Sequence, residues 1–339
     1  MKRSKSPGKV AKMADVAALA GVTIMTVSRA LHTPSAVSPA TLEKVQEAIR
    51  ETGFVPNYAA RSLVSQRSPI VVALFPTMMN SVFSGTIEEL SRQFSAQGYS
   101  LLLGETSFDI DTEEKLLSGF MGWRPAAIIL TGSRHTEVSR KMLENSGVPV
   151  VELWNLPRDP FDLAVGLSNH QAAYDMTRSL HEWGYRRISF LNLNYPNNDR
   201  SVDRSAGYRQ AMTELGLEVT PDMEISVPFG LEHASAAVQQ LLKITPKVDA
   251  VFCSSDSLAV GVMMGALRAG LSIPGDLAIA GFGNVELAAT VVPSLTTVDV
   301  PRAQIGRECA RIIMERLRGG YRGPPVVDCG YSIVRRESA

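Results

Sequence analysis

The segment from residue 23 to residue 32 carries side chains that suit contacts with double-stranded DNA. Arg29 can donate two parallel hydrogen bonds to O6 and N7 of guanine, and Ile24 and Met25 can contact the methyl groups of thymine. Neighbouring hydroxyl groups can donate hydrogen bonds to phosphate oxygens. We therefore expect this segment to contact DNA through Thr23, Ile24, Met25, Thr26, Ser28, Arg29 and His32.

Two short helices joined by a glycine turn would position these side chains. Gly21 tolerates a positive φ and ends the first helix, and Thr23 can cap the second by accepting a hydrogen bond from a backbone N–H. The apolar pairs that mark the two helices are Val16 with Leu19 and Val27 with Leu31. This arrangement predicts a helix-turn-helix, whose second helix can enter the major groove. The same spacing also fits an ordinary helical hairpin in a helical protein.

A third helix and an excess of positive charge favour DNA binding over that alternative. Ser38 and Pro39 suit the start of a helix and Gly53 suits its end. The apolar face of this helix would comprise Leu42, Val45 and Ile49. Residues 1–67 contain ten Lys and Arg but four Asp and Glu, whereas the whole chain is neutral. A basic module beside a larger acidic domain is the electrostatic pattern of a phosphate-binding unit.

Length and composition set limits on the class of protein. A chain of 339 residues predicts two or three domains. Its three cysteines are unclustered and lack metal-site spacing, which is typical of a reducing compartment. The basic start lacks the apolar segment of a secretory signal, and no run of about 18 apolar residues could span a membrane. We therefore expect a cytoplasmic protein without membrane partners, whose first eleven residues form a disordered arm.

From about residue 69 onward, short apolar runs alternate with helical patterns. The predicted strands are 70–75, 99–103, 126–130, 148–153, 187–191, 250–253 and 277–282. Continuous apolar runs of this length are typical of strands that are buried on both faces. Repeated strand–helix units predict parallel, doubly wound sheets, and two sets of them indicate two lobes.

Catalytic motifs are missing from the sequence. The first strand is not followed by G-x-G-x-x-G, and the chain has no P-loop, no G-x-S-x-G elbow and no H-E-x-x-H. We therefore predict no catalytic residue, no metal site and no cofactor. An α/β enzyme with an accessory DNA-binding domain stays open, because scattered Ser, His and Asp residues could assemble in space. A sugar-binding or transport receptor is a second alternative, although the basic helical module and the missing signal segment oppose it.

Taken together, these motifs resemble those of the LacI/GalR family of bacterial repressors. The N-terminal match comprises D-V-A-A-L-A-G-V-T-x-x-T-V-S-R-A-L from Asp15, V-S-P-A-T from Val37 and G-F-V-P-N-Y-A-A-R-S-L from Gly53. The match continues with I-V-V-A-L-F from Ile70, G-Y-R-R-I-S-F-L from Gly184, C-S-S-D-S-L-A-V-G from Cys253, I-A-G-F-G-N from Ile279 and P-S-L-T-T-V from Pro293. The motifs that resemble the gluconate-operon repressor branch are P-V-V-E-L from Pro149 and L-A-V-G-L-S-N from Leu163.

This resemblance implies three regions. A helix-turn-helix headpiece would span 1–56, a hinge helix and linker 57–68, and an effector-binding and dimerisation domain 69–339. The last would consist of two interleaved lobes, as in periplasmic binding proteins, with the chain crossing between them three times. The expected lobes are about 69–167 with 296–325, and about 168–295 with 326–339.

The resemblance also implies the partners. The chain would bind pseudo-palindromic, double-stranded operator DNA as a homodimer, with a tetramer as a further assembly. Leu63 of the hinge would wedge into the minor groove. The hinge residues expected to contact DNA are Asn57, Tyr58, Arg61 and Leu63.

The ligand implied is a small sugar acid. Arg204 matches the arginine with which relatives hold their effector; the alternative is a solvated arginine at a helix start. Trp154, Ser255 and Gly283 stand where relatives carry acidic or amide residues. Carboxylates that suit the hydroxyls of a neutral sugar would repel an anion, so their loss beside a retained arginine indicates a sugar acid such as gluconate. The expected cleft residues are Asn80, Phe83, Thr131, His135, Glu152, Trp154, Arg204, Ser255 and Asn284.

Two residues of that set need not both face the cleft. Glu152 and Trp154 share one face of a strand, so one of them can instead pack against a helix. The sequence as a whole predicts a DNA-binding transcriptional regulator, acting as a repressor, whose operator affinity is switched by a sugar acid between two lobes.

Overall fold

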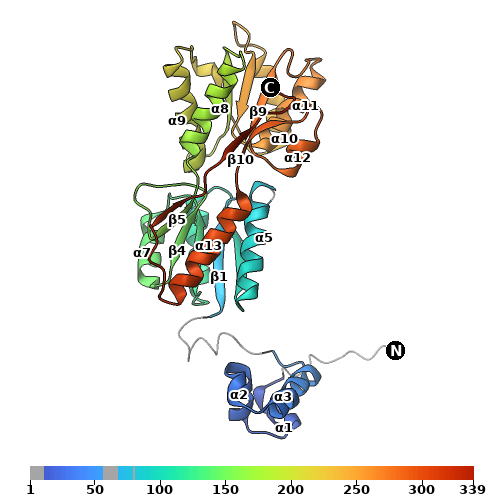
Figure 1. Cartoon of the computed structure of the whole chain (residues 1–339), viewed down its shortest axis with the longest axis vertical. Helices are drawn as coiled ribbons and strands as arrows, with labels where there is room; N and C mark the ends of the chain where they lie inside the picture. Colours follow the sequence, from blue (N-terminus) through green and yellow to red (C-terminus); the bar gives the residue numbers. More distant parts are fainter. Residues whose placement is uncertain (1–10, 56–67, 79–80) are drawn as a thin grey trace, which may run out of the picture. The chain divides into compact units, whose positions relative to one another are not determined.

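A computed structural model describes residues 11–55, 68–78 and 81–339 of the chain. The chain divides into two compact units, Met1–Gln66 and Arg67–Ala339, each of which is described by itself. Over the residues described, the first unit contains helices and no strand, and the second is an α/β core (Figure 1). The predicted fold class, a helical headpiece followed by two doubly wound lobes, is confirmed.

The helical unit contains the three predicted helices. They are α1 (Met13–Ala20), α2 (Ile24–His32) and α3 (Pro39–Thr52), with a short 3₁₀ turn, η1 (Pro34–Ala36), between the last two. Gly21 ends α1 with φ 64°, and the Thr23 side chain caps α2 by accepting a hydrogen bond from the Thr26 N–H at 3.2 Å. Ser38 caps α3 in the same way.

The core of this unit is formed where the three helices meet. Its buried residues are Val16, Ala17, Val27, Ala30, Val45, Ala48 and Phe54. Leu19 was expected on the apolar face of α1, but it is 52% exposed, which corrects that prediction. Val16 and Ala17 already cover the contact with the other two helices, so Leu19 lies on the outer side of α1.

The first lobe of the α/β core is built on an all-parallel, six-stranded sheet in the order β11-β5-β4-β3-β1-β2. Its strands are β1 (Ile70–Phe75), β2 (Ser100–Glu105), β3 (Ala127–Thr131), β4 (Val150–Leu153), β5 (Leu163–Gly166) and β11 (Val326–Asp328). Its helices are α5 (Ser81–Ala96), α6 (Ile110–Met121), α7 (Glu137–Ser146) and α13 (Arg302–Leu317). Helices α5 and α13 lie side by side (Figure 1).

The second lobe has a six-stranded sheet in the order β12-β10-β9-β8-β6-β7, in which β12 alone pairs antiparallel. Its strands are β6 (Ile188–Leu193), β7 (Glu224–Val227), β8 (Ala250–Cys253), β9 (Ala278–Gly283), β10 (Thr296–Asp299) and β12 (Ser332–Val334). Its helices are α8 (Asn169–Glu182), α9 (Asp199–Glu214), α10 (Leu231–Leu241), α11 (Asp256–Arg268) and α12 (Glu286–Thr290), with a 3₁₀ turn, η2 (Pro221–Met223).

The chain crosses between the lobes three times, as expected, but two expected lobe boundaries are wrong. Residues 296–299 pair with β9 in the second lobe, and residues 326–328 pair with β5 in the first. The crossings therefore lie between β5 and α8, between β10 and α13, and between β11 and β12. Strand pairing decides the assignment, because each segment completes the backbone hydrogen bonds of its neighbouring strand.

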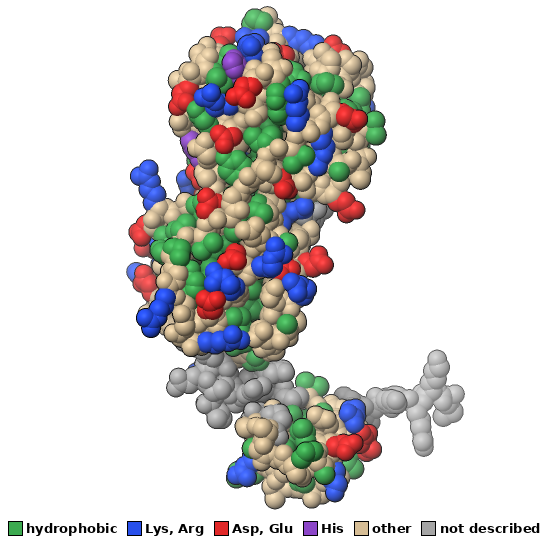
Figure 2. All heavy atoms as spheres, in the orientation of Figure 1, with side chains coloured by type: hydrophobic (Ala, Val, Ile, Leu, Met, Phe, Trp, Pro, Cys, Tyr) green, Lys and Arg blue, Asp and Glu red, His purple; other side chains and the backbone are tan. Residues whose placement is uncertain are grey.

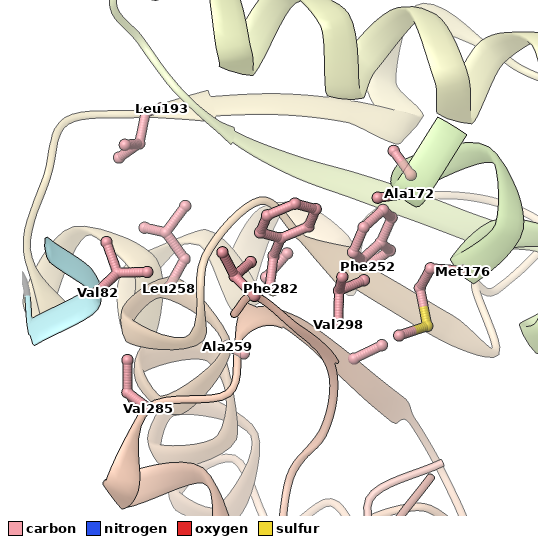
Figure 3. Close-up of a cluster of buried hydrophobic side chains, with 14 of the residues drawn as sticks. Val82, Ala172, Met176, Leu193, Phe252, Leu258, Ala259, Phe282, Val285 and Val298 are labelled. Carbon is pink, nitrogen blue, oxygen red and sulfur yellow. The ribbon is translucent and has the colours of Figure 1, made fainter. Parts of the chain in front are cut away.

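Apolar side chains from strands and helices fill the second lobe. In Figure 3, Phe282 of β9 lies between Leu258 of α11 and Phe252 of β8, and Val298 of β10 lies near the two rings. Phe282 lies at the edge of this core, near the carboxyl end of β9, on the side of the second lobe that faces the first lobe.

Candidate ligand-binding site

A small cavity lies between the two lobes, at the carboxyl ends of the parallel strands. This is where open α/β sheets bind ligands. The first lobe contributes Val82, Phe83, Phe108 and Trp154, and the second contributes Leu193, Asn198, Arg200, Arg204, Ser254, Ser255 and Phe282. A second small cavity adjoins it, because Phe108, Asn198 and Arg200 line both.

Unpaired polar atoms converge on the first cavity. Over the part of the chain that the structure describes, four buried side-chain polar atoms have no hydrogen-bond partner: Trp154 Nε1, Asn198 Oδ1, Arg204 Nε and Ser254 Oγ. All four residues line this cavity. A buried polar group without a partner costs about 1–3 kcal/mol, and such groups are rare in native proteins. Their presence around one cavity makes this cavity the candidate site for a polar ligand.

Arg204 is the main cation of this cavity. Its side chain leaves α9, its Nη1 donates to Asn169 Oδ1 at 2.7 Å, and its guanidinium lies 4.5 Å from the centre of the Phe282 ring. Burial and, next to it, the positive charge of Arg200 lower the pKa of Arg204 to about 9, against the effect of two nearby aspartates. Arg204 therefore stays charged at neutral pH, and a bound anion would be strongly attracted to it.

Arg200 lies one helical turn before Arg204 on α9 and lines the same cavity. Its Nη1 is 3.1 Å from Asp199 Oδ1, so this buried arginine is ion-paired. The carboxylate of Asp199 also reaches the first lobe, where its Oδ2 accepts hydrogen bonds from the backbone N–H and Oγ of Ser133 at 2.8 and 2.9 Å. Asn155 Nδ2 donates to the same oxygen at 3.1 Å.

Aromatic side chains form the apolar wall. Phe83 of α5 packs edge-on against Trp154, with ring centres 5.0 Å apart. Trp154 has φ 73°, an uncommon value for a bulky residue, and Asn169 Nδ2 holds its carbonyl oxygen at 2.7 Å. Such backbone strain clusters at functional sites. Phe108 of the first lobe stacks on Tyr195 of the second, with ring centres 4.4 Å apart.

The structure brings four of the predicted ligand residues together at the cavity: Phe83, Trp154, Arg204 and Ser255. Thr131 lines the adjoining cavity, where its hydroxyl donates to the Leu74 carbonyl oxygen at 2.8 Å. Asn80 lies outside the described residues.

Three predicted ligand residues are not at the cavity. His135 is buried between Glu113 and Glu152, whose carboxylates occupy both of its ring nitrogens. Glu152 is therefore the residue of the strand pair that turns away, and it also accepts a hydrogen bond from the Phe161 N–H. Asn284 bonds Asp299 and Arg336 in an outer groove.

That outer groove is larger, about 730 Å³, and lies between α5, α12 and the start of α13. Two of its arginines already bond the protein, because Arg302 donates to the Asn284 carbonyl oxygen and Arg336 to the Leu295 carbonyl oxygen. None of the four unpaired polar atoms lies there. The smaller cavity between the lobes is therefore the better ligand site.

Sequence reasoning did not single out the other seven cavity residues, which are Val82, Phe108, Leu193, Asn198, Arg200, Ser254 and Phe282. A signal for Arg200 was present, because D-R-S-V-D-R from Asp199 places two arginines four residues apart on one helical face. Within the described residues, no group of three or more His, Cys, Asp or Glu side chains is placed to hold a metal ion.

The helical unit presents the predicted DNA-contacting residues on α2. Ile24 and Met25 are 52% and 65% exposed, and Thr23 and Arg29 are exposed, whereas Val27 and Ala30 are buried. Thr26 and Ser28 are half-buried, and His32 lies in the last turn of α2. Asn57, Tyr58, Arg61 and Leu63 lie outside the described residues.

Helices α1 and α2 meet at a bend of 102°. Helix-turn-helix motifs have crossing angles of about 90–120°. No single described helix is long and apolar enough to cross a membrane; this bent pair passes only when its two helices are added together, by length and composition.

On the face of the α/β core in Figure 2, Lys and Arg side chains are intermixed with Asp and Glu. By sequence, the excess of positive charge belongs to residues 1–67.

A helix-turn-helix unit joined to a two-lobed core with a polar cavity defines a ligand-responsive DNA-binding protein. Residues 12–57 match the model of bacterial regulatory proteins of the lacI family, and residues 177–339 match a periplasmic binding protein-like domain. The chain belongs to the LacI family and is a transcriptional regulator with a DNA-binding helix-turn-helix.

Relatives support this over nearly the full length. The chain is 34% identical over 322 residues to the HTH-type transcriptional regulator GntR of Escherichia coli (strain K12), covering 94% of this chain and 96% of that protein. It is 32% identical to the HTH-type transcriptional repressor CytR of the same strain, covering 96% of each. A solved LacI-family transcriptional regulator from Silicibacter pomeroyi is 32% identical with a TM-score of 0.89, covering 97% of this chain and 99% of that one.

Proposed function

We propose that this regulator is a repressor whose operator affinity is switched by a sugar acid, gluconate or a close relative, bound in the cavity between the lobes. The observation that carries the proposal is the set of unpaired polar atoms around a buried arginine. Arg204 would hold the carboxylate through charge-assisted hydrogen bonds. Asn198, Ser254 and the indole N–H of Trp154 would bond the hydroxyl groups.

The charge of the cavity favours an anion over a neutral sugar. Its lining residues include two arginines and no carboxylate. Among the residues that the structure describes, no carboxylate lies within ion-pair distance of the buried Arg204 guanidinium. The rings of Phe83 and Trp154 would cover the carbon chain.

On the DNA side, we place α2 in the major groove, with Arg29 on a guanine and Ile24 and Met25 beside it. Thr26 and Ser28 would contact phosphates. Two copies of the chain would bind the two halves of a pseudo-palindromic operator. The hinge would become helical on the operator and insert Leu63 into the minor groove.

Ligand binding would reach the DNA through the angle between the lobes. The ligand contacts residues of both lobes, so it favours one arrangement of them, and that arrangement sets the spacing of the two hinges. The shift in operator affinity can be no larger than the difference between the ligand's affinities for the two arrangements.

The test is calorimetric titration of the purified protein with gluconate, glucose and a neutral polyol. We expect gluconate to bind most tightly and Arg204→Ala to weaken it by about 2–5 kcal/mol, because a buried charged partner is lost. Arg209→Ala is the matched control, since Arg209 lies on the same helix but is exposed and paired with Glu224. A gel shift on upstream DNA with and without gluconate checks the switch.

Two results would contradict the sugar-acid assignment. One is glucose binding as tightly as gluconate. The other is an unchanged gluconate affinity in Arg204→Ala.

A further inference from the structure

Asp199 and Arg200 form a buried ion pair at the edge of the cavity. Both side chains are more than nine-tenths buried, and Asp199 Oδ1 also accepts a hydrogen bond from the Arg200 backbone N–H at 2.8 Å. The pair packs against Gly132, where an added Cβ would lie 2.5 Å from Arg200 Nη1 and 2.7 Å from Asp199 Oδ1. Only a residue without a side chain leaves room for the pair.

The first lobe fixes the position of the Asp199 carboxylate. Ser133 and Asn155 both donate hydrogen bonds to its Oδ2, while Oδ1 faces Arg200. Burial by itself would raise the pKa of Asp199, but Arg200 and these hydrogen bonds outweigh burial and keep the pKa below its ordinary value. Asp199 is therefore a fixed negative charge beside the cavity.

This arrangement divides the roles of the two cavity arginines. The charge of Arg200 is neutralised by Asp199, whereas Arg204 is bonded to the uncharged Asn169. The described part of the cavity therefore offers one uncompensated positive charge. A ligand with one carboxylate matches it, but the second carboxylate of a dianion would be buried next to an ion pair that is already complete.

We infer that Asp199 is a specificity-determining residue that restricts the cavity to singly charged sugar acids by occupying Arg200. This inference rests on the proposed sugar-acid function. If Asp199 lost its charge, Arg200 would become free to hold a second anionic group.

Gluconate and glucarate provide the matched ligands, because they share a six-carbon chain and differ in whether the sixth carbon is a hydroxymethyl or a carboxylate. Calorimetric titration of the wild-type protein should give at least about tenfold tighter binding for gluconate. Asp199→Asn should reduce that preference by about tenfold or more, because loss of the negative charge frees Arg200 to hold the second carboxylate. The asparagine side chain can still accept a hydrogen bond from Ser133.

Two control variants separate charge from closure of the lobes. Ser133→Ala removes a contact between the lobes without changing charge, so it should weaken both ligands and leave their ratio unchanged. Asp203→Asn removes a half-buried aspartate of the same helix. Asp203 accepts a hydrogen bond from Asn155 but is not ion-paired with Arg200, so this variant should shift the ratio less. The double variant Asp199→Asn, Arg200→Gln should restore the preference for gluconate.

Three results would overturn the inference, and a fourth would contradict the proposed function instead. Glucarate binding as tightly as gluconate to the wild type would overturn the inference, even if Asp199→Asn failed to fold. So would an unchanged ratio in Asp199→Asn, or an equal shift in Asp203→Asn. A wild-type protein that binds neither acid would instead contradict the proposed function.

Discussion

At the scale of single residues, His135 acts in the interior of the first lobe. It lies 2.6 Å from Glu113 Oε1 and 3.1 Å from Glu152 Oε1, with its side chain fully buried. Burial by itself lowers the pKa of His135, but the hydrogen bonds and charges of the two glutamates outweigh it and raise the pKa to about 9. His135 thus links α6 to β4 as a buried cation.

This raised pKa predicts a dependence of stability on pH. The folded protein holds the His135 proton up to about pH 9, whereas the ordinary pKa is 6.5. The stabilisation is therefore complete below pH 6.5 and is lost as pH rises through 9, and its size is ~3 kcal/mol. Denaturant midpoints at pH 6 and pH 9 should differ more in the wild type than in His135→Gln. Exposed His233→Gln is the control, and an identical pH dependence in His135→Gln would contradict the assignment.

The sequence could not place His135, because nothing local distinguishes a buried histidine from a solvated one. Its partners come from α6 and β4, which are far apart in the chain. Arg204 was predictable from the family motif, whereas the pairing of Arg200 with Asp199 depends on room left by Gly132.

At the scale of elements, α9 carries the site. The apolar spacing of the sequence indicates a helix only over 205–215, whereas α9 begins at Asp199. Its first turn is polar because it faces the other lobe and the cavity rather than its own sheet. The 3.6-residue apolar repeat is therefore absent where the functional residues lie. The central strands were predictable from their apolar runs, whereas β5 and β7 were not predicted.

The close packing of α9 against α8 should fix the position of the cavity residues that α9 carries. A Cβ at Gly207 of α9 would lie 2.1 Å from the His170 carbonyl oxygen of α8. Gly207→Ala should therefore separate the helices, lower the free energy of unfolding by about 1–3 kcal/mol and weaken gluconate binding. Gly119→Ala is the matched control, because its Cβ meets no atom within 4 Å and it lies exposed in α6. Denaturant unfolding and calorimetry measure both effects, and equal results for the two variants would contradict this account.

At the scale of the whole molecule, the two sheets and the three crossings follow from strand–helix alternation and the family motif. The lobe boundaries near the C-terminus did not, because a three- or four-residue strand such as β10 or β11 has no signal for which sheet it will join. Pairing with β9 or β5 decides that only in three dimensions.

The symmetry of the expected operator determines how many copies of the chain bind it. One three-helix unit covers one half-site, so a two-fold operator requires two copies of the chain. The second lobe exposes large apolar side chains on three consecutive helices: Leu231 of α10, Met264 and Leu267 of α11, and Leu287 of α12. Exposed apolar side chains gathered on neighbouring elements are typical of protein–protein contacts.

We expect a dimer by sedimentation velocity at micromolar concentration. Leu267→Glu should shift it toward monomer and weaken operator binding while gluconate still binds, because the cavity lies within one chain. A wild-type monomer at that concentration, or full operator affinity in a monomeric variant, would rule out the two-fold arrangement.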